Sequence, residues 1–182
     1  MIITSREFKL PSGEVLTVRS LCAEDAEALS AFRYATFSET HFLARYPEEC
    51  KQNLEAMRKG LAGSESSALN FEVGAFAGKK LAGEFGVAQV RPHLKYRHRA
   101  GMGISVLKDY WGCGLGSYLM QLAIDQTRAN GFEQLELGVY SDNSRAIHLY
   151  ERFGFERYGI QPRAFKLKDG TYRDEIIMVK ML

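Results

Sequence analysis

The sequence has 182 residues, of which 46% are apolar and 25% are charged, and its formal net charge is +2. This composition is ordinary for a soluble globular protein and excludes disordered, collagen-like and coiled-coil chains, and the length predicts a single domain over residues 1–182. The small net charge gives no reason to expect a nucleic-acid partner, and the lack of any run of about 18 apolar residues predicts no membrane span.

The first half of the chain predicts short strands, two helices and a hairpin. Alternation of apolar and polar residues indicates the strands, and acidic residues in the first turns favour helix starts. The elements are expected at residues 8–10, 15–19, 23–36, 47–61, 71–75 and 85–89, with a loop at 60–67.

The second half begins with an alternating strand and then changes to a helical period. Leu115, Leu119 and Leu122 share one face of an expected amphipathic helix, which Gly131 ends. A strand, a short helix stopped by Gly154 and a hairpin around an Asp-Gly turn follow. These elements are expected at residues 102–106, 114–130, 135–139, 146–153 and on either side of 169–170.

The order of elements predicts an α+β fold. Only one strand–helix–strand crossover is present, and hairpins make the other connections. We therefore expect a mixed, mostly antiparallel sheet of about seven strands flanked by helices.

The cysteines and histidines show no pattern of metal ligands. The three cysteines are widely spaced and form no CxxC pair, and the four histidines have no ligand spacing. We therefore expect no metal and no disulfide framework. The N-terminal residues do not form a signal peptide, so a reduced, cytoplasmic protein is expected.

The most informative segment is 104–117, where a strand end leads through three alternating glycines into a helix. Glycines allow positive φ and close approach of a ligand, and the unpaired N–H groups of a helix N-terminus attract anions. A phosphate cradle and a purely structural tight turn both fit this pattern. A P-loop does not, because no Lys-Ser/Thr follows the glycines, and the match to a Rossmann fingerprint is imperfect.

Two motifs in this sequence resemble those of the GCN5-related N-acetyltransferase (GNAT) superfamily. Trp-Gly-Cys-Gly-Leu-Gly at 111–116 is similar to its acetyl-CoA motif, Gln/Arg-x-x-Gly-x-Gly/Ala, with Trp111 at the first position. Residues 143–155 match Asn-x-x-Ala-x-x-Leu-Tyr-x-x-x-Gly-Phe at every named position. The Tyr-Trp-Gly form of the loop resembles a branch with polyamine and protein N-terminal acetyltransferases.

The resemblance implies a sheet splayed between its fourth and fifth core strands, which are the strand ending at Val106 and the strand 135–139. It also implies acetyl-CoA as co-substrate, with the pantetheine arm along the first strand's backbone and the pyrophosphate on the loop amides. The implied cofactor-binding residues are Ile104, Ser105, Val106, Cys113, Gly114, Leu115, Gly116, Ser117 and Asn143.

The resemblance further implies an N-acetyltransferase that moves the acetyl group directly to a primary amine. Tyr150 is the expected acid for the leaving thiolate, although it could also simply pack on the apolar face of its helix. Glu84 is the candidate general base, although it could equally be a solvated strand residue. Glu39 falls in the family's acceptor-binding loop and could attract a cationic amine.

The acceptor is not readable from the sequence. A polyamine-like small amine is expected first, and a protein N-terminus or an aminoglycoside next. The alternative from another class is a non-catalytic acetyl-CoA sensor or interaction module. Members of the family commonly dimerise, so a homodimer is a further expectation. The basic segment 91–99 is expected to be a solvated loop.

Overall fold

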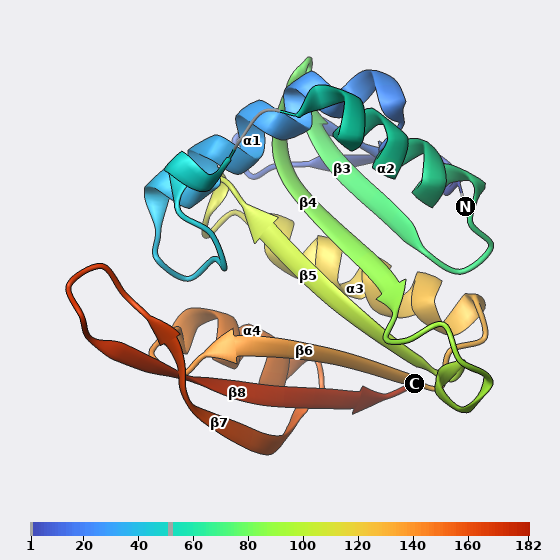
Figure 1. Cartoon of the computed structure of the whole chain (residues 1–182). Coiled ribbons are helices and arrows are strands. Elements are labelled where there is room, and N and C mark those ends of the chain that lie inside the picture. The colour runs from blue at the N-terminus through green and yellow to red at the C-terminus, as the bar shows by residue number, and fades with distance from the viewer. Residues whose placement is uncertain (1, 51–52) are drawn as a thin grey trace. The chain divides into compact units, whose positions relative to one another are not determined.

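The computed structural model describes residues 2–50 and 53–182 (Figure 1). The chain forms two compact units: the first comprises Met1–Ala88 and Gly103–Ala123, and the second Gln89–Met102 and Ile124–Leu182. The fifth strand and the third helix each contribute residues to both units, so neither unit is a continuous stretch of chain.

The first unit contains an antiparallel run of four strands covered by helices. Neighbouring strands pair in chain order, with Val18 opposite Ala75 and Val73 opposite Phe85. The strands are β1 (Arg6–Lys9), β2 (Val15–Ser20), β3 (Phe71–Ala77) and β4 (Lys80–Gln89), and the helices are α1 (Ala26–Glu39) and α2 (Leu54–Ser66). Short 3-10 turns occupy η1 (Ala23–Asp25), η2 (Pro47–Glu49) and η4 (Lys108–Tyr110).

Opposite faces of β4 meet different helices. A Cβ at Gly83 would contact Leu115 and Leu119 of helix α3 (Leu115–Ala129), whereas the neighbouring Glu84 bonds to Arg33 of α1. The alternation of side chains along a strand produces this division.

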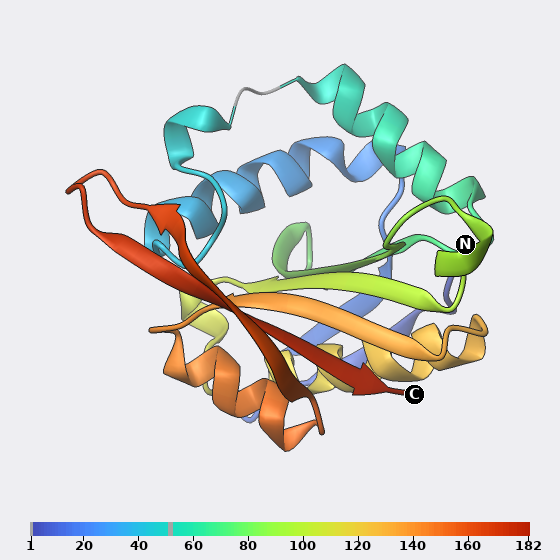
Figure 2. The ribbon, with the colours of Figure 1, turned by 60° about the horizontal axis from the view of Figure 1, so that its bottom comes forward.

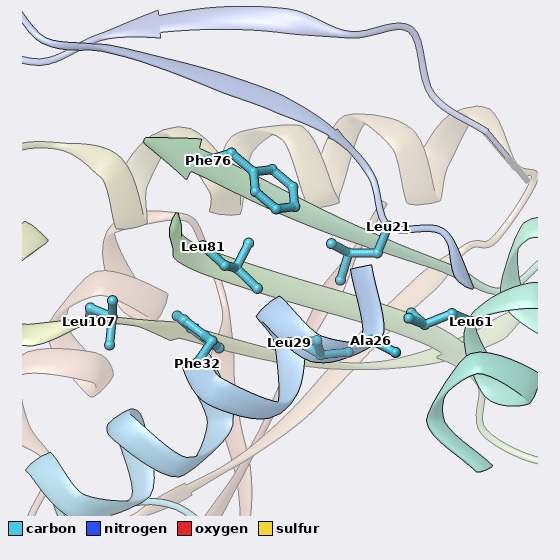
Figure 3. Packing of buried hydrophobic residues seen from close by; sticks show 8 residues of the cluster. All are labelled: Leu21, Ala26, Leu29, Phe32, Leu61, Phe76, Leu81 and Leu107. Carbon is cyan, nitrogen blue, oxygen red and sulfur yellow. The ribbon is translucent and has the colours of Figure 1, made fainter. Parts of the chain in front are cut away.

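Apolar residues of α1, α2, β3 and β4 form the core on the α1 side (Figure 3). Phe76, Leu81 and Leu21 converge there with Phe32 of α1. Leu107, directly after strand β5 (Arg99–Val106), belongs to the same cluster and is 4% exposed. The chain is therefore anchored in the core just before the glycine-rich loop.

The second unit is built on β6 (Gln134–Tyr140), which has different partners on its two sides. The beginning of β5 pairs with β6 in parallel through Arg99, Ala100 and Gly101. On the other side, β8 (Tyr172–Met181) is antiparallel to β6 and to β7 (Glu156–Lys166), and β7 and β8 form a long twisted hairpin (Figure 2). Helix α4 (Ser144–Arg152) and the turn η3 (Leu94–Tyr96) complete this unit.

The α+β class predicted from the sequence is confirmed. The described residues form eight strands, one more than expected, in the hydrogen-bonded order β1-β2-β3-β4-β5-β6-β8-β7, and only the β5–β6 pair is parallel. Three residue pairs join β5 to β6, and β5 then continues to Val106, which agrees with a splay at this strand pair.

The second helix differs from the expectation. A helix from Pro47 to Leu61 followed by a loop is wrong, because η2 ends at Glu49 and α2 runs from Leu54 to Ser66. Residues 51 and 52 lie outside the described residues. The Asn53 side chain accepts a hydrogen bond from the Ala56 N–H at 2.9 Å and so caps the new helix start. Packing of Leu61, which is 1% exposed, keeps the glycine-containing segment helical despite its low propensity.

None of the helices in residues 2–50 and 53–182 combines the length and apolar character that a membrane crossing requires.

Gly74 of β3 provides a test of core packing. A Cβ there would lie 2.6 Å from Leu21 Cδ2 and 2.7 Å from Leu81 Cδ1, both of which are buried in the core. We expect Gly74→Ala to lower the free energy of unfolding by about 1–3 kcal/mol through overpacking, as measured by urea denaturation.

The matched control is Gly86→Ala on the neighbouring strand. Its added Cβ would make only an ordinary contact, 3.5 Å from Glu72 Cγ, so the stability should stay within about 0.5 kcal/mol of the parent. Equal losses in both variants would contradict the packing argument.

Candidate active site

The glycine-rich loop begins from a fixed point at the end of β5. The Leu107 N–H donates to the Ala82 carbonyl at 3.0 Å, and the Leu107 side chain is buried. After the turn η4, Gly112 and Gly114 take φ values of 76° and 88°, in the left-handed region that only glycine adopts without strain. Two of the alternating glycines in the sequence thus occupy backbone positions that require a glycine.

The loop delivers the chain to the N-terminus of α3. The helical hydrogen bonds begin with the Tyr118 N–H donating to the Gly114 carbonyl at 3.0 Å, so the N–H groups of Leu115 and Gly116 have no acceptor within the helix. No atom lies within 4 Å of the position that a Cβ at Gly112 would take. The main chain is therefore approachable from that side, and its donors suit an anionic diphosphate.

A stacked pair of aromatic rings packs beside the glycine loop. The rings of Phe8 and Tyr118 are stacked with centroids 4.6 Å apart, and a Cβ at Gly114 would lie 3.8 Å from the Phe8 ring. The first turn of α3 is thus held against β1. No local sequence pattern predicts this contact, because Phe8 and Tyr118 are far apart in the chain.

Trp111 has a structural role that the sequence did not reveal. Its indole N–H donates to the Val106 carbonyl at 2.7 Å, which closes the turn between the strand end and the first glycine. Val106 is one of the backbone positions expected to bind pantetheine. A carbonyl oxygen has two lone pairs, so one acceptor site on Val106 is already used and one is left.

A cavity of about 330 Å³ adjoins the loop at the turn between β1 and β2. Its lining includes Glu14 and Asp109, whose negative charge makes the cavity unsuitable for a phosphate. The Cys113 thiol lies 2.9 Å from the Tyr110 carbonyl, so it is engaged in the loop itself. The lining residues are Leu10, Pro11, Ser12, Glu14, Asp109, Tyr110 and Cys113.

Glu84, the base expected from the sequence, lies in an ion pair with Arg33. The arginine donates to both Glu84 oxygens at 3.1 and 3.3 Å and reaches Glu72 at 3.5 Å. Burial raises the pKa of Glu84 above its ordinary value, while the Arg33 charge opposes that rise. The Glu84 side chain is 13% exposed, and both of its oxygens are occupied, so a free base is not what this geometry presents.

Glu39, expected to bind the acceptor, contacts the loop's entry instead. Its carboxylate accepts a hydrogen bond from the Lys108 N–H at 2.9 Å, at the first residue of η4. The end of α1 is thereby tied to the turn that precedes the glycines. The acceptor-binding role of Glu39 stays a prediction.

Asn143 lies at the start of α4 in the second unit. Its side-chain oxygen accepts a hydrogen bond from the Ala146 N–H at 3.2 Å, so the Asn-x-x-Ala spacing of the motif is first of all a helix cap. The amide NH₂ group makes no hydrogen bond that involves residues 2–50 or 53–182. Its donors are available for the predicted contact with pantetheine.

Tyr150 is 8% exposed on α4, and its ring centroid lies 6.0 Å from that of Phe155. Burial raises the pKa of the phenol to about 12. Its hydroxyl has no partner in the described residues, and in that part of the chain every fully buried side-chain polar atom has one. The hydroxyl therefore reaches the surface, as a protonated donor at neutral pH.

The basic segment between β4 and β5 is exposed at its tip, where Leu94 is 85% accessible. The guanidinium groups of Arg91 and Arg99 each lie over the Tyr96 ring, 5.7 and 5.4 Å from its centroid. Within the described chain, no group of three or more His, Cys, Asp or Glu side chains could hold a metal ion.

Comparison with known proteins identifies the family. The family model described as "Acetyltransferase (GNAT) family" matches residues 29–155, which include both sequence motifs. This chain belongs to the acetyltransferase (GNAT) family. Acetyl-CoA is the co-substrate of that family, and the glycine loop at the start of α3 fits its diphosphate.

A solved structure of a GNAT-family acetyltransferase from Streptococcus pneumoniae is similar over almost the whole fold. The TM-score is 0.87 and the identity 31%, and the alignment covers 92% of this chain and 99% of that one. The GNAT fold expected from the two motifs is therefore confirmed.

Curated relatives match over shorter stretches. The L-methionine sulfoximine/L-methionine sulfone acetyltransferase of Pseudomonas paraeruginosa is 33% identical over 88 residues, 48% of this chain and 51% of that protein. The [ribosomal protein bS18]-alanine N-acetyltransferase of Escherichia coli is 39% identical over 75 residues, 41% of this chain and 50% of that protein. The chain thus spans about half the length of the curated relatives it matches, and neither relative is named for a polyamine.

Proposed function

We propose that this protein transfers an acetyl group from acetyl-CoA to an α-amino group of an amino-acid-like molecule or a peptide N-terminus. The observation that carries the proposal is the loop at 112–116, in which two left-handed glycines open onto the unpaired amides of α3. Membership of the GNAT family supports the choice of donor.

The names of the relatives support the choice of acceptor. One acts on methionine sulfoximine or sulfone, and another on the alanine of a ribosomal protein. A third, from Schizosaccharomyces pombe, is named an N-alpha-acetyltransferase and is 34% identical over 55 residues. These names favour an α-amine over the polyamine-like acceptor that the sequence suggested first.

Different groups of the chain bind the co-substrate and donate the proton. The backbone of Ile104, Ser105 and Val106 and the amides of residues 113–117 hold the co-substrate, and Asn143 adds a side-chain donor. The bound co-substrate supplies an activated acyl group in its thioester. Tyr150, protonated at every working pH, donates its proton to the departing sulfur.

A panel of amines tests the function. We expect thiol release from acetyl-CoA with L-methionine sulfone or with a hexapeptide that begins with alanine, and less with spermidine or kanamycin. Mass spectrometry of the products should show the added acetyl group. Binding of acetyl-CoA without thiol release from any of the four amines would instead support a non-catalytic sensor.

Gly114→Ala tests the backbone cradle. An L-residue at φ near 88° is strained by about 1–2 kcal/mol, and relief of that strain turns the neighbouring amides away from the diphosphate. We expect the Kd for coenzyme A, measured by calorimetry, to rise at least about tenfold.

The matched control for this variant is Gly131→Ala, just after the last turn of α3. Gly131 has a φ of 81° and no atom within 4 Å of an added Cβ, so it carries the same kind of backbone strain at the other end of that helix. Its Kd should equal that of the parent. Unchanged affinity in Gly114→Ala would remove the cradle assignment.

Tyr150→Phe tests the acid. The variant keeps the ring that packs near Phe155 and loses only the hydroxyl, so we expect kcat to fall by about 10²-fold or more while the Kd for coenzyme A stays within about twofold. Steady-state kinetics and calorimetry measure the two quantities. Full turnover in this variant would show that another group protonates the sulfur.

A further inference from the structure

Glu175 of β8 lies across the backbone of the neighbouring strand β6. It is paired with Tyr140, and in an antiparallel ladder the residue two positions before Tyr140, Gly138, lies on the same face. A Cβ at Gly138 would collide with the Glu175 carboxylate, with Glu175 Cδ only 2.8 Å away. The carboxylate thus occupies the space that any side chain at position 138 would need.

The carboxylate of Glu175 is not committed to another group. It takes part in no hydrogen bond or ion pair with residues 2–50 or 53–182, and its oxygens are not fully buried. The Glu175 side chain therefore lies over β6 because Gly138 leaves space for it there, and not because a cation attracts it.

Three carboxylates on or next to β6 and β8 differ from Glu175 because they are engaged. Glu136 of β6 accepts from the Arg99 guanidinium, and Asp174 accepts from the Arg163 N–H at 2.7 Å. Arg173, which is two residues from Glu175 on the same strand, is bonded to Asp142 at 2.7 Å. Strand β6 carries no basic residue, and within the described residues no basic side chain of β8 forms an ion pair with Glu175.

The surroundings of Glu175 are largely uncharged. Tyr140, its partner on β6, is 6% exposed, and its ring stacks on Phe165 of β7 with centroids 3.7 Å apart. Its partner on β7 is Gln161, and Ile177 follows on the same face of β8. Burial beside these groups raises the pKa of Glu175 above its ordinary value, and no charge contributes to that rise.

We propose that the Glu175 carboxylate is the general base that takes a proton from the ammonium group of the acceptor. In this step an N–H bond of the ammonium breaks and an O–H bond on Glu175 forms, leaving a neutral amine and a neutral carboxyl group. The proton then passes to water, which accounts for the one proton that acetylation of an ammonium releases. This role rests on the acetyl transfer proposed above.

Glu175 is better suited to this role than Glu84. A proton acceptor must present a free oxygen to the amine, and both oxygens of Glu84 are held by Arg33. Glu175 has no counter-ion in the described residues, and its oxygens are not fully buried, so an oxygen is free to accept the proton.

The kinetic test uses Glu175→Gln and whichever of the four amines the wild-type protein acetylates fastest. At pH 7 we expect kcat to fall by about 10²-fold or more with the KM for acetyl-CoA unchanged. The deficit should shrink as the pH rises above the pKa of the amine, about 8 for an α-amino group, because the acceptor is then neutral without help. Glu84→Gln and the exposed Glu156→Gln serve as comparisons and should lose less than Glu175→Gln.

Stability gives a readout that does not depend on turnover. Because burial raises the pKa of Glu175, the ionised form costs folding stability as the pH rises above about 4.5, and glutamine carries no such cost. Glu175→Gln should therefore unfold at the same or a higher denaturant concentration than the wild type at pH 7. A purely structural glutamate would give the opposite result.

Distinct outcomes separate the two proposals. If the wild type acetylates an amine and Glu175→Gln keeps its kcat, loses it equally at all pH values or only raises the KM for the amine, the base assignment is wrong and the proposed function stands. If the wild type acetylates none of the four amines, the proposed function fails and the base assignment fails with it. Gly138→Ala, which displaces the carboxylate without removing its charge, should reproduce the loss in kcat.

Discussion

The site depends on one anchoring arrangement at the end of β5. The Leu107 side chain is buried in the core, and its N–H is bonded to Ala82 on β4, so the chain leaves the sheet from a fixed position. Glu39 then holds the next N–H, at Lys108, and the Trp111 indole holds the Val106 carbonyl. The left-handed glycines can orient their amides only because both ends of the turn are fixed.

Most of the fold could be predicted from the sequence because its elements have clear periods and clear stops. The helix after the glycines has a strict apolar stripe, and the expected bounds 114–130 differ from Leu115–Ala129 by one residue at each end. The second helix was expected with the wrong bounds: the glycines and serines in the second half of α2 have low helix propensity, while the burial of Leu61 decides the conformation there. Tertiary packing of this kind leaves no local signal in a single sequence.

The parts of the candidate site that the backbone forms could be predicted from the sequence. The parts that depend on pairs of side chains from different elements could not. Positive φ at Gly112 and Gly114 follows from glycine spacing, and the cap at Asn143 follows from its motif. The partners of Glu84, Glu39 and Trp111 lie on other elements or across a turn, so no spacing rule gives them. Glu175 was missed for the same reason: what distinguishes it is a glycine on the neighbouring strand.

The close approach of Glu175 to Gly138 has a consequence for the evolution of this family. The two positions share one volume, so they cannot both carry large side chains in the same register. Homologous sequences should therefore show coupled substitution, in which a side chain at the position of Gly138 accompanies a shorter residue at that of Glu175. The acidic group could then come from either β6 or β8. Proton transfer from the acceptor could therefore be kept in a homologue whose acidic residue lies on the other strand.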